Sequence, residues 1–285
     1  MNAVQGTTST EATVTSSDGT TITTESRGRG PAIVIVDPAM STRGDSAKLA
    51  IALAGTFTAT TYDRRGRGDS DDRSDGVTDP QREIDDIEAV IRASGGHAVL
   101  FGSSSGAALA LEAATRLGPE RVSAVVLYEP PFIVDDSRPP LDPALPARVA
   151  AEVARGESSR AVRSFFVEAV GVPAFMVGIM RLLPMWKRAK AVVPTTRYDF
   201  AVLAGTQDGA PLPADRWAAM RAPGLVLVGS KSEPFFHSGA KALAATVPSI
   251  RYESLDGAHH GSPQMAPDGI AKRIIHEFGA SGRQA

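Results

Sequence analysis

The chain has 285 residues with a formal net charge of −2, and it contains 42% hydrophobic residues, 22% charged residues and no cysteine. The missing cysteines exclude disulfides, thiolate metal sites and a cysteine nucleophile. The small net charge gives no basic field for nucleic acid or a membrane surface. No apolar run is long enough to span a bilayer, and residues 1–10 lack a signal-peptide core, so we expect a polar tail on a cytoplasmic protein.

The first half of the chain alternates between short strands and helices. Residues 12–14 and 20–24 alternate around Asp18-Gly19, which predicts a β-hairpin. Continuous apolar runs then predict buried strands, and amphipathic segments between them predict helices. This alternation favours a mostly parallel sheet flanked by helices. The expected strands are 32–36, 57–62, 98–101 and 122–127, and the expected helices are 46–53, 81–93 and one that ends near Gly118.

The pattern changes after Pro130-Pro131. Residues 133–217 are helical, interrupted by proline and carry no clear strand, so they predict a helical cap inserted between two strands. The remaining segments, 11–132 and 218–285, would form the α/β core. The expected cap helices are 147–154, 160–170, 174–183 and 197–203, and the core resumes with strands 224–228 and 250–254 and helices 238–245 and 270–278.

A nucleophile is indicated by the sequence Gly-Ser-Ser-Ser-Gly at residues 102–106. The motif follows an expected strand and opens an Ala- and Leu-rich helix, which is the setting of a nucleophile elbow centred on Ser104. Small flanking residues are needed there because strand and helix pass close together. The helix N-terminus also favours developing negative charge.

A serine nucleophile needs a base, and the base needs an acid that orients it. Chain order in this architecture is serine, acid, histidine, and His259 and His260 follow the last expected strand. We favour His260 as the base, because it lies three residues after Gly257 and seven before Pro267, which opens the last helix. His259 then lies beside it in the same loop.

The acid has two candidates. After strand 224–228, the position where an aspartate is expected holds Ser232, and Glu233 is next to it. The alternative is Glu129, at the end of the preceding sheet strand and followed by two prolines that fix the turn. We favour Glu129, because a carboxylate at that strand end can reach the same imidazole.

The tetrahedral oxyanion of acyl transfer needs preorganised donors. We expect one from the backbone N–H of Ser105. The other should come from the loop after strand 32–36, where Pro38 has no N–H, so Ala39 is the expected donor and Met40 the second choice.

The chain resembles the α/β-hydrolase superfamily over nearly its whole length. The resemblance rests on the elbow, on the loop at 37–39, on the stretch 63–70, which is similar to the family's DxRGxGxS turn, and on residues 257–260. It implies the α/β-hydrolase fold. Two departures, Asp37-Pro38 for the usual His-Gly and Ser232 for the late aspartate, are similar to zearalenone-type lactone hydrolases. In that branch the acid is a glutamate after the earlier strand, which supports Glu129 and implies a lactone or ester of an aromatic polyketide-like alcohol.

The cap and the sheet ends are expected to supply an apolar pocket. Its expected substrate contacts are Met40, Phe132, Met180 and Trp186, and the cap residues Phe165, Phe166, Met176 and Met185 either line the pocket or pack the cap. No residue spacing indicates a metal site, a dinucleotide site or a P-loop, so we expect neither metal nor cofactor.

The sequence therefore predicts a serine hydrolase that cleaves a carboxylic ester or lactone of a small apolar substrate through an acyl-enzyme. The alternatives are acyl transfer, cyclisation or C–C cleavage by the same site, and a ligand-binding sensor that retains the fold.

Overall fold

The computed structural model describes residues 8–279, and the expected tail at 1–10 lies mostly outside them. Within this range an eight-stranded sheet has the order β1-β2-β4-β3-β5-β6-β7-β8. The β1–β2 and β2–β4 pairs are antiparallel, and the other pairs are parallel. The strands are β1 Thr10–Thr15, β2 Thr21–Arg27, β3 Ala32–Val36, β4 Thr58–Tyr62, β5 Ala98–Ser103, β6 Val122–Tyr128, β7 Gly224–Gly229 and β8 Ile250–Leu255.

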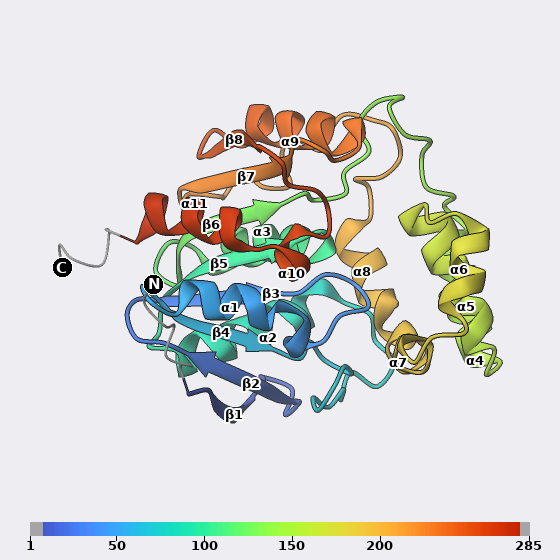
Figure 1. The fold of residues 1–285 in the computed structure, drawn as a ribbon, viewed down its shortest axis with the longest axis horizontal. Coiled ribbons are helices and arrows are strands. Elements are labelled where there is room, and N and C mark those ends of the chain that lie inside the picture. The colour runs from blue at the N-terminus through green and yellow to red at the C-terminus, as the bar shows by residue number, and fades with distance from the viewer. Residues whose placement is uncertain (1–7, 280–285) are drawn as a thin grey trace.

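Helices cover both faces of the sheet and follow most of the strands (Figure 1). In the core these are α1 Ala47–Leu53, α2 Pro80–Ala93, α3 Ser105–Leu117, α9 Pro234–Thr246, α10 Ser262–Met265 and α11 Asp268–Phe278, with a 3-10 helix η1 Arg43–Ser46 before α1. The hairpin prediction is confirmed, since Thr15 faces Thr21 and the Asp18 carboxylate accepts a 3.0 Å hydrogen bond from the Thr20 N–H.

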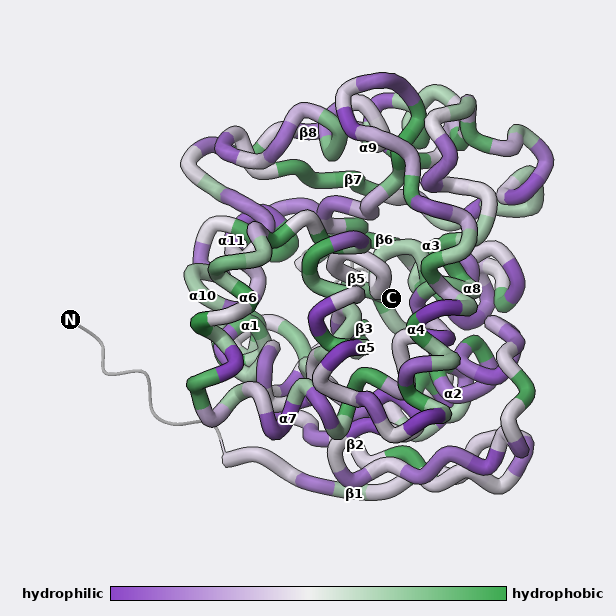
Figure 2. The backbone as a smooth tube through the Cα atoms, turned by 90° about the vertical axis from the view of Figure 1, so that its right-hand side faces the viewer, coloured by the Kyte–Doolittle hydropathy of each residue, from purple (hydrophilic) through white to green (hydrophobic). Residues whose placement is uncertain are grey.

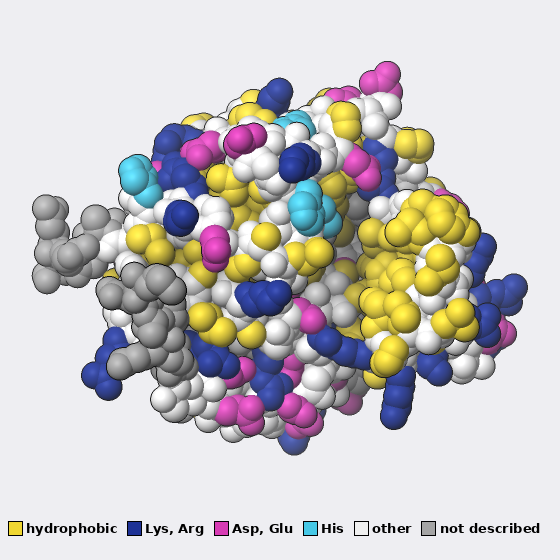
Figure 3. Space-filling model, viewed as in Figure 1, with side chains coloured by type: hydrophobic (Ala, Val, Ile, Leu, Met, Phe, Trp, Pro, Cys, Tyr) yellow, Lys and Arg dark blue, Asp and Glu magenta, His cyan; other side chains and the backbone are white. Residues whose placement is uncertain are grey.

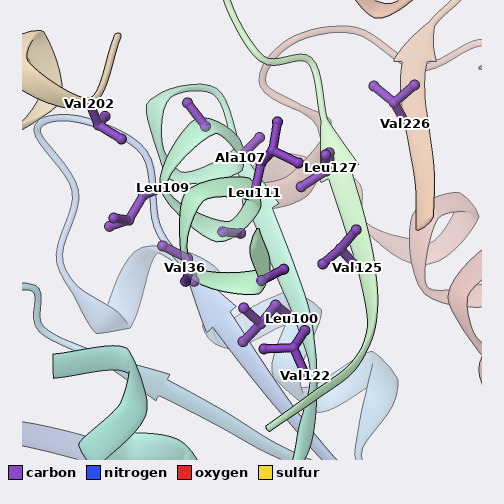
Figure 4. Packing of buried hydrophobic residues seen from close by; sticks show 14 of the residues in the cluster. Val36, Leu100, Ala107, Leu109, Leu111, Val122, Val125, Leu127, Val202 and Val226 are labelled. Atoms are coloured by element: carbon purple, nitrogen blue, oxygen red, sulfur yellow. The ribbon is translucent and has the colours of Figure 1, made fainter. Parts of the chain in front are cut away.

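Side-chain alternation along the strands divides the core between the two faces of the sheet. Val34 and Val36 of β3 pack on the side of α2, α3 and α9, whereas Ile33 and Ile35 pack on the side of α1 and α11. Helix α3 is buried along most of its length against β3, β5 and β6 (Figure 4). Hydropathy follows burial along the sheet. The buried strand β7 is hydrophobic, whereas the exposed edge strand β1 is mostly of intermediate or hydrophilic character (Figure 2).

The segment between β6 and β7 is helical and lies at one end of the sheet (Figure 1). Its elements are α4 Leu145–Ala154, α5 Ser158–Ser164, a π-helical segment η2 Phe165–Val170, α6 Ala174–Met180, α7 Met185–Val192, a 3-10 turn η3 Val193–Thr195 and α8 Thr196–Leu203. They share a separate apolar cluster that includes Leu145, Val162, Phe165 and Trp186. None of the helices between residues 8 and 279 combines the length and the apolar character needed to cross a bilayer.

Candidate active site

Ser104 stands at a sharp reversal between β5 and α3. Its backbone has φ 54° and ψ −125°, a region that a non-glycine residue rarely adopts, and its N–H donates to the Tyr128 carbonyl at 2.8 Å. A Cβ at Gly102 would come within 2.3 Å of the Gly106 carbonyl oxygen, and one at Gly106 within 2.3 Å of the Val36 carbonyl oxygen. Glycine is therefore required on both sides of the turn.

His260 and Glu129 meet although 131 positions separate them. The imidazole Nδ1 lies 2.7 Å from Glu129 Oε2, the glutamate side chain is fully buried, and the histidine side chain is 40% exposed. The imidazole is therefore partly accessible, and both His260 and Ser104 line the same cavity. The three groups are thus brought to one end of the sheet.

The Glu129 carboxylate is fixed from two further directions. Its Oε1 accepts hydrogen bonds from the Gly229 N–H at 2.7 Å and from the Ser232 hydroxyl at 2.6 Å. Ser232, which occupies the position where an aspartate was expected, thus binds the carboxylate on the neighbouring strand. The Glu129 backbone is left-handed at φ 49°, a second strained position at the same sheet edge.

The alternative acid and the alternative base have other contacts. The Glu233 side chain is 69% exposed, and its Oε2 lies 3.9 Å from Arg138 Nη1. The Nδ1 of His259 accepts from the Gly261 N–H at 3.1 Å, and the His259 carbonyl accepts from the Tyr128 hydroxyl at 2.8 Å. These contacts give His259 a role in holding the loop that carries His260.

A cavity of about 510 Å³ lies between the sheet end and the cap, which is the helical segment between β6 and β7. Figure 3 shows the hollow beside the apolar surface of the cap. Its lining is mainly apolar, in agreement with the expected pocket. Among the cap residues named from the sequence, Phe165, Phe166 and Met176 line it.

The four predicted substrate contacts require correction, because none of them lines the cavity. Phe132 is fully buried and stacks on Trp217 with ring centroids 5.6 Å apart. Trp186 is buried inside the cap and donates from Nε1 to the Ser159 hydroxyl at 3.2 Å. Met40 and Met180 pack at the edge of the cap's own apolar cluster. An apolar residue near a sheet end satisfies the core as readily as a pocket, and sequence alone does not separate the two.

The backbone donors near the elbow are only partly as expected. The Ser105 N–H lies in the first turn of α3, where the helix offers it no carbonyl partner. The Ala39 N–H instead donates to the Ser105 hydroxyl at 2.8 Å, so this amide is engaged. Met40, the second choice, has a left-handed backbone at φ 64°. The sequence argument considered the backbone of residue 105 and overlooked its hydroxyl.

Comparison with known proteins assigns the fold to a family. The model of the alpha/beta hydrolase family matches residues 37–273. The chain belongs to this family. A search of curated proteins gave no significant match.

Solved structures give the same result for this alpha/beta hydrolase. It is 43% identical to an alpha/beta hydrolase from Sphaerobacter thermophilus, with 94% of this chain and 100% of that chain covered and a TM-score of 0.84. An aryl esterase described as putative from Burkholderia cenocepacia matches at 19% identity, 95% and 100% coverage and a TM-score of 0.69. Carboxylesterase CesB from Bacillus subtilis matches at 17% identity, 96% and 92% coverage and a TM-score of 0.68. The last two show a shared fold.

A charged network beneath the cavity was not anticipated. Asp199 of α8 is fully buried between two arginines of the 63–70 turn, with its oxygens 2.7 Å from Arg64 Nη1 and 2.7 Å from Arg67 Nη2. Arg64 also forms two 2.7 Å hydrogen bonds to Glu83, and the Ser105 hydroxyl donates to Asp199 at 2.8 Å. Burial by itself raises the pKa of Asp199, but the charges of Arg64 and Arg67 outweigh it and hold that pKa below its ordinary value.

This network ties a cap helix of the hydrolase to the elbow. Sequence reasoning assigned the 63–70 turn a shaping role only, and nothing in the sequence pairs an arginine with an aspartate 135 positions away. Among residues 8–279, no group of three or more His, Asp or Glu side chains is arranged to hold a metal ion.

Proposed function

We propose that this alpha/beta hydrolase cleaves carboxylic esters or lactones through an acyl-enzyme on Ser104. The observation that carries the proposal is the 2.7 Å contact between the buried Glu129 carboxylate and His260 Nδ1, with His260 and Ser104 on one cavity. A buried carboxylate behind an imidazole selects the tautomer that leaves the second ring nitrogen free to accept a proton.

The reaction would follow from these positions. His260 Nε2 removes the proton of the Ser104 hydroxyl as its oxygen attacks the substrate carbonyl, and Glu129 stabilises the imidazolium that forms. The imidazolium then gives its proton to the departing alkoxide, which leaves as an alcohol. Water, deprotonated by the same imidazole, attacks the acyl-enzyme and releases the acid and free Ser104.

The negative charge on the tetrahedral intermediate needs donors at the N-terminus of α3. The Ser105 N–H is available for this role. The Ala39 N–H can serve as the second donor once the substrate oxygen replaces the Ser105 hydroxyl as its acceptor, since catalytic hydrogen bonds often form fully only with substrate bound.

The substrate class is supported by the cavity. A mainly apolar space of about 510 Å³ suits a small molecule with an aromatic or alkyl part. The related folds include a carboxylesterase and an aryl esterase described as putative. The zearalenone-type likeness adds lactones of aromatic alcohols to the candidates.

A panel of neutral esters and lactones tests the proposal, with initial rates measured for the wild-type protein and for Ser104→Ala. We expect turnover of at least one class by the wild type and a loss of at least about a thousandfold in kcat/KM in Ser104→Ala, because the nucleophile is gone. Product analysis with added alcohol separates hydrolysis from acyl transfer. No turnover of any panel member, or full activity in Ser104→Ala, would contradict the proposal.

A further inference from the structure

One cationic side chain lies on the wall of the cavity and is not used in the mechanism above. Arg138, in the segment between β6 and α4, is the only lysine or arginine among the residues that line the cavity within the described range. Its side chain is only 17% exposed. A largely buried guanidinium facing an apolar cavity calls for an account of what balances its charge.

The protein itself balances this charge poorly. Arg138 Nη2 donates a hydrogen bond to the Ala169 carbonyl at 3.0 Å. The guanidinium carbon lies over the Phe235 ring, 4.6 Å from the ring centroid. The carboxylate of Glu233 lies 3.9 Å from Nη1, and its side chain is 69% exposed. Burial lowers the pKa of Arg138, and the opposing charge of Glu233 does not restore it. Donors of the guanidinium fork thus remain for another acceptor.

Arg138 is connected to the catalytic histidine by a short stack of rings. The imidazole of His260 stacks on the Phe236 ring with their centroids 4.5 Å apart. The Phe236 and Phe235 ring centroids are 4.0 Å apart, and the Phe235 ring lies under the Arg138 guanidinium. These rings separate the guanidinium from the reacting centre and line the cavity between them. A ligand that extends along these rings from Ser104 to Arg138 would place its scissile bond at Ser104 and its far end at Arg138.

A second charged cap residue that lines the cavity, Asp199, is already neutralised. Asp199 is paired with Arg64 and Arg67 beneath the elbow, so it offers no competing partner for Arg138. Gly171 packs closely against the guanidinium, because it has φ +90° and a Cβ there would lie 3.0 Å from Arg138 Nη2.

We propose that Arg138 binds a carboxylate carried by the substrate, so that the preferred substrates are esters or lactones with an anionic group away from the scissile bond. The proposal rests on the hydrolase function proposed above and narrows its substrate class. Arginine suits this role, because its planar fork matches a carboxylate and a partly dry wall strengthens the pairing.

The test compares matched anionic and neutral esters. One pair is 4-acetoxybenzoate and its methyl ester, with the charge on the leaving group, and the other is 4-nitrophenyl hydrogen glutarate and 4-nitrophenyl pentanoate, with the charge on the acyl group. In Arg138→Gln, we expect KM for at least one anionic ester to rise about tenfold, with kcat and the neutral esters changed less than about twofold. The pair that responds identifies the half of the substrate that Arg138 binds.

Three further variants sharpen the comparison. Arg138→Lys should recover part of the loss, because it keeps the charge without the fork. Glu233→Gln should lower KM for the responding anionic ester, because it removes a competing carboxylate. Arg181→Gln, at an exposed cap position that does not line the cavity, should change nothing. Equal changes for anionic and neutral esters in Arg138→Gln, or no change for either pair, would overturn the proposal.

Binding measured without turnover separates this inference from the proposed function. If the wild type hydrolyses no ester, calorimetric titration with 4-butylbenzoate, which has no scissile bond, still tests the anion site. Binding by the wild type that weakens about tenfold in Arg138→Gln, but not in Arg181→Gln, would support a carboxylate site even if the hydrolase proposal fails. Equal affinities, or no binding by the wild type, would contradict it.

Discussion

Asp37 shows how one buried side chain beside the candidate site can affect stability. It follows β3 and is fully buried, with Oδ1 accepting a hydrogen bond from the Ser46 hydroxyl and Oδ2 without any partner. Burial raises the pKa of Asp37 from 3.8 to about 8, the Ser46 hydrogen bond opposes the rise, and the charge of Asp45 adds to it. Folding thus favours the protonated acid.

The first prediction concerns the pH dependence of stability. The folded state keeps a proton on Asp37 up to pH about 8, and the unfolded chain releases it near pH 3.8, so this group lowers stability as pH rises between the two values. Asp37→Asn removes that cost. Urea unfolding should show Asp37→Asn gaining stability relative to the wild type between pH 5 and pH 8.

Asp136→Asn serves as the control, because Asp136 is exposed. Its stability difference from the wild type should stay flat over the same pH range. A flat difference for Asp37→Asn as well would show that Asp37 is not held protonated in the folded protein.

At the scale of elements, helix α8 connects the cap to the α/β core. Asp199 on this helix receives hydrogen bonds from Arg64, Arg67 and Ser105, all of them on the core side. Thr195, at the start of the same helical segment, accepts from Arg67 Nε at 3.0 Å. Removing one partner of a buried ion pair is costly, because the remaining charges lose their compensation.

Asp199→Asn should therefore lower the free energy of unfolding at pH 7 by about 3 kcal/mol. The folded-state pKa of Asp199 is lowered, so its contribution is present above the unfolded value of 3.8, starts to fall near that value and is lost as pH falls through the lower folded value. Denaturant unfolding at pH 7 and at pH 3.5 checks both points, with the exposed Asp215→Asn as the control. A loss of less than about 1 kcal/mol in the free energy of unfolding at pH 7 would contradict a structural role for the ion pairs of Asp199 with Arg64 and Arg67.

Most elements of the core could be predicted because they carry a strong local signal. Helix α2 begins at Pro80, directly after the Asp79 side chain that caps it, and its apolar face has helical spacing. The cap was predicted less completely. Helix α7, Met185–Val192, was missed because prolines and charged residues hide its short apolar face, and the expected helix 160–170 is divided into α5 and a π-helical segment.

At the scale of the whole molecule, the sharp turn at Ser104 between β5 and α3 could be predicted from the sequence, since it depends on local residues beside a strand. Contacts that join distant segments could not be predicted in this way. The Ser105 hydroxyl that occupies the Ala39 amide and the arginine pairs of Asp199 depend on how cap and core meet. The cavity wall could not be predicted either. Phe166 and Trp186 are both aromatic cap residues, but Phe166 lines the cavity and Trp186 is buried inside the cap.

The central claim is that Ser104, Glu129 and His260 act together, with Glu129 rather than Glu233 as the acid. The most direct test measures kcat/KM on a neutral ester for the wild type, Glu129→Gln and Glu233→Gln, with circular dichroism to confirm folding. We expect Glu129→Gln to lose about a thousandfold or more, because the imidazole loses its orientation and its counter-charge, and Glu233→Gln to stay within about threefold of the wild type. Equal losses in the two variants, or a Glu129→Gln protein of near wild-type activity, would contradict the account.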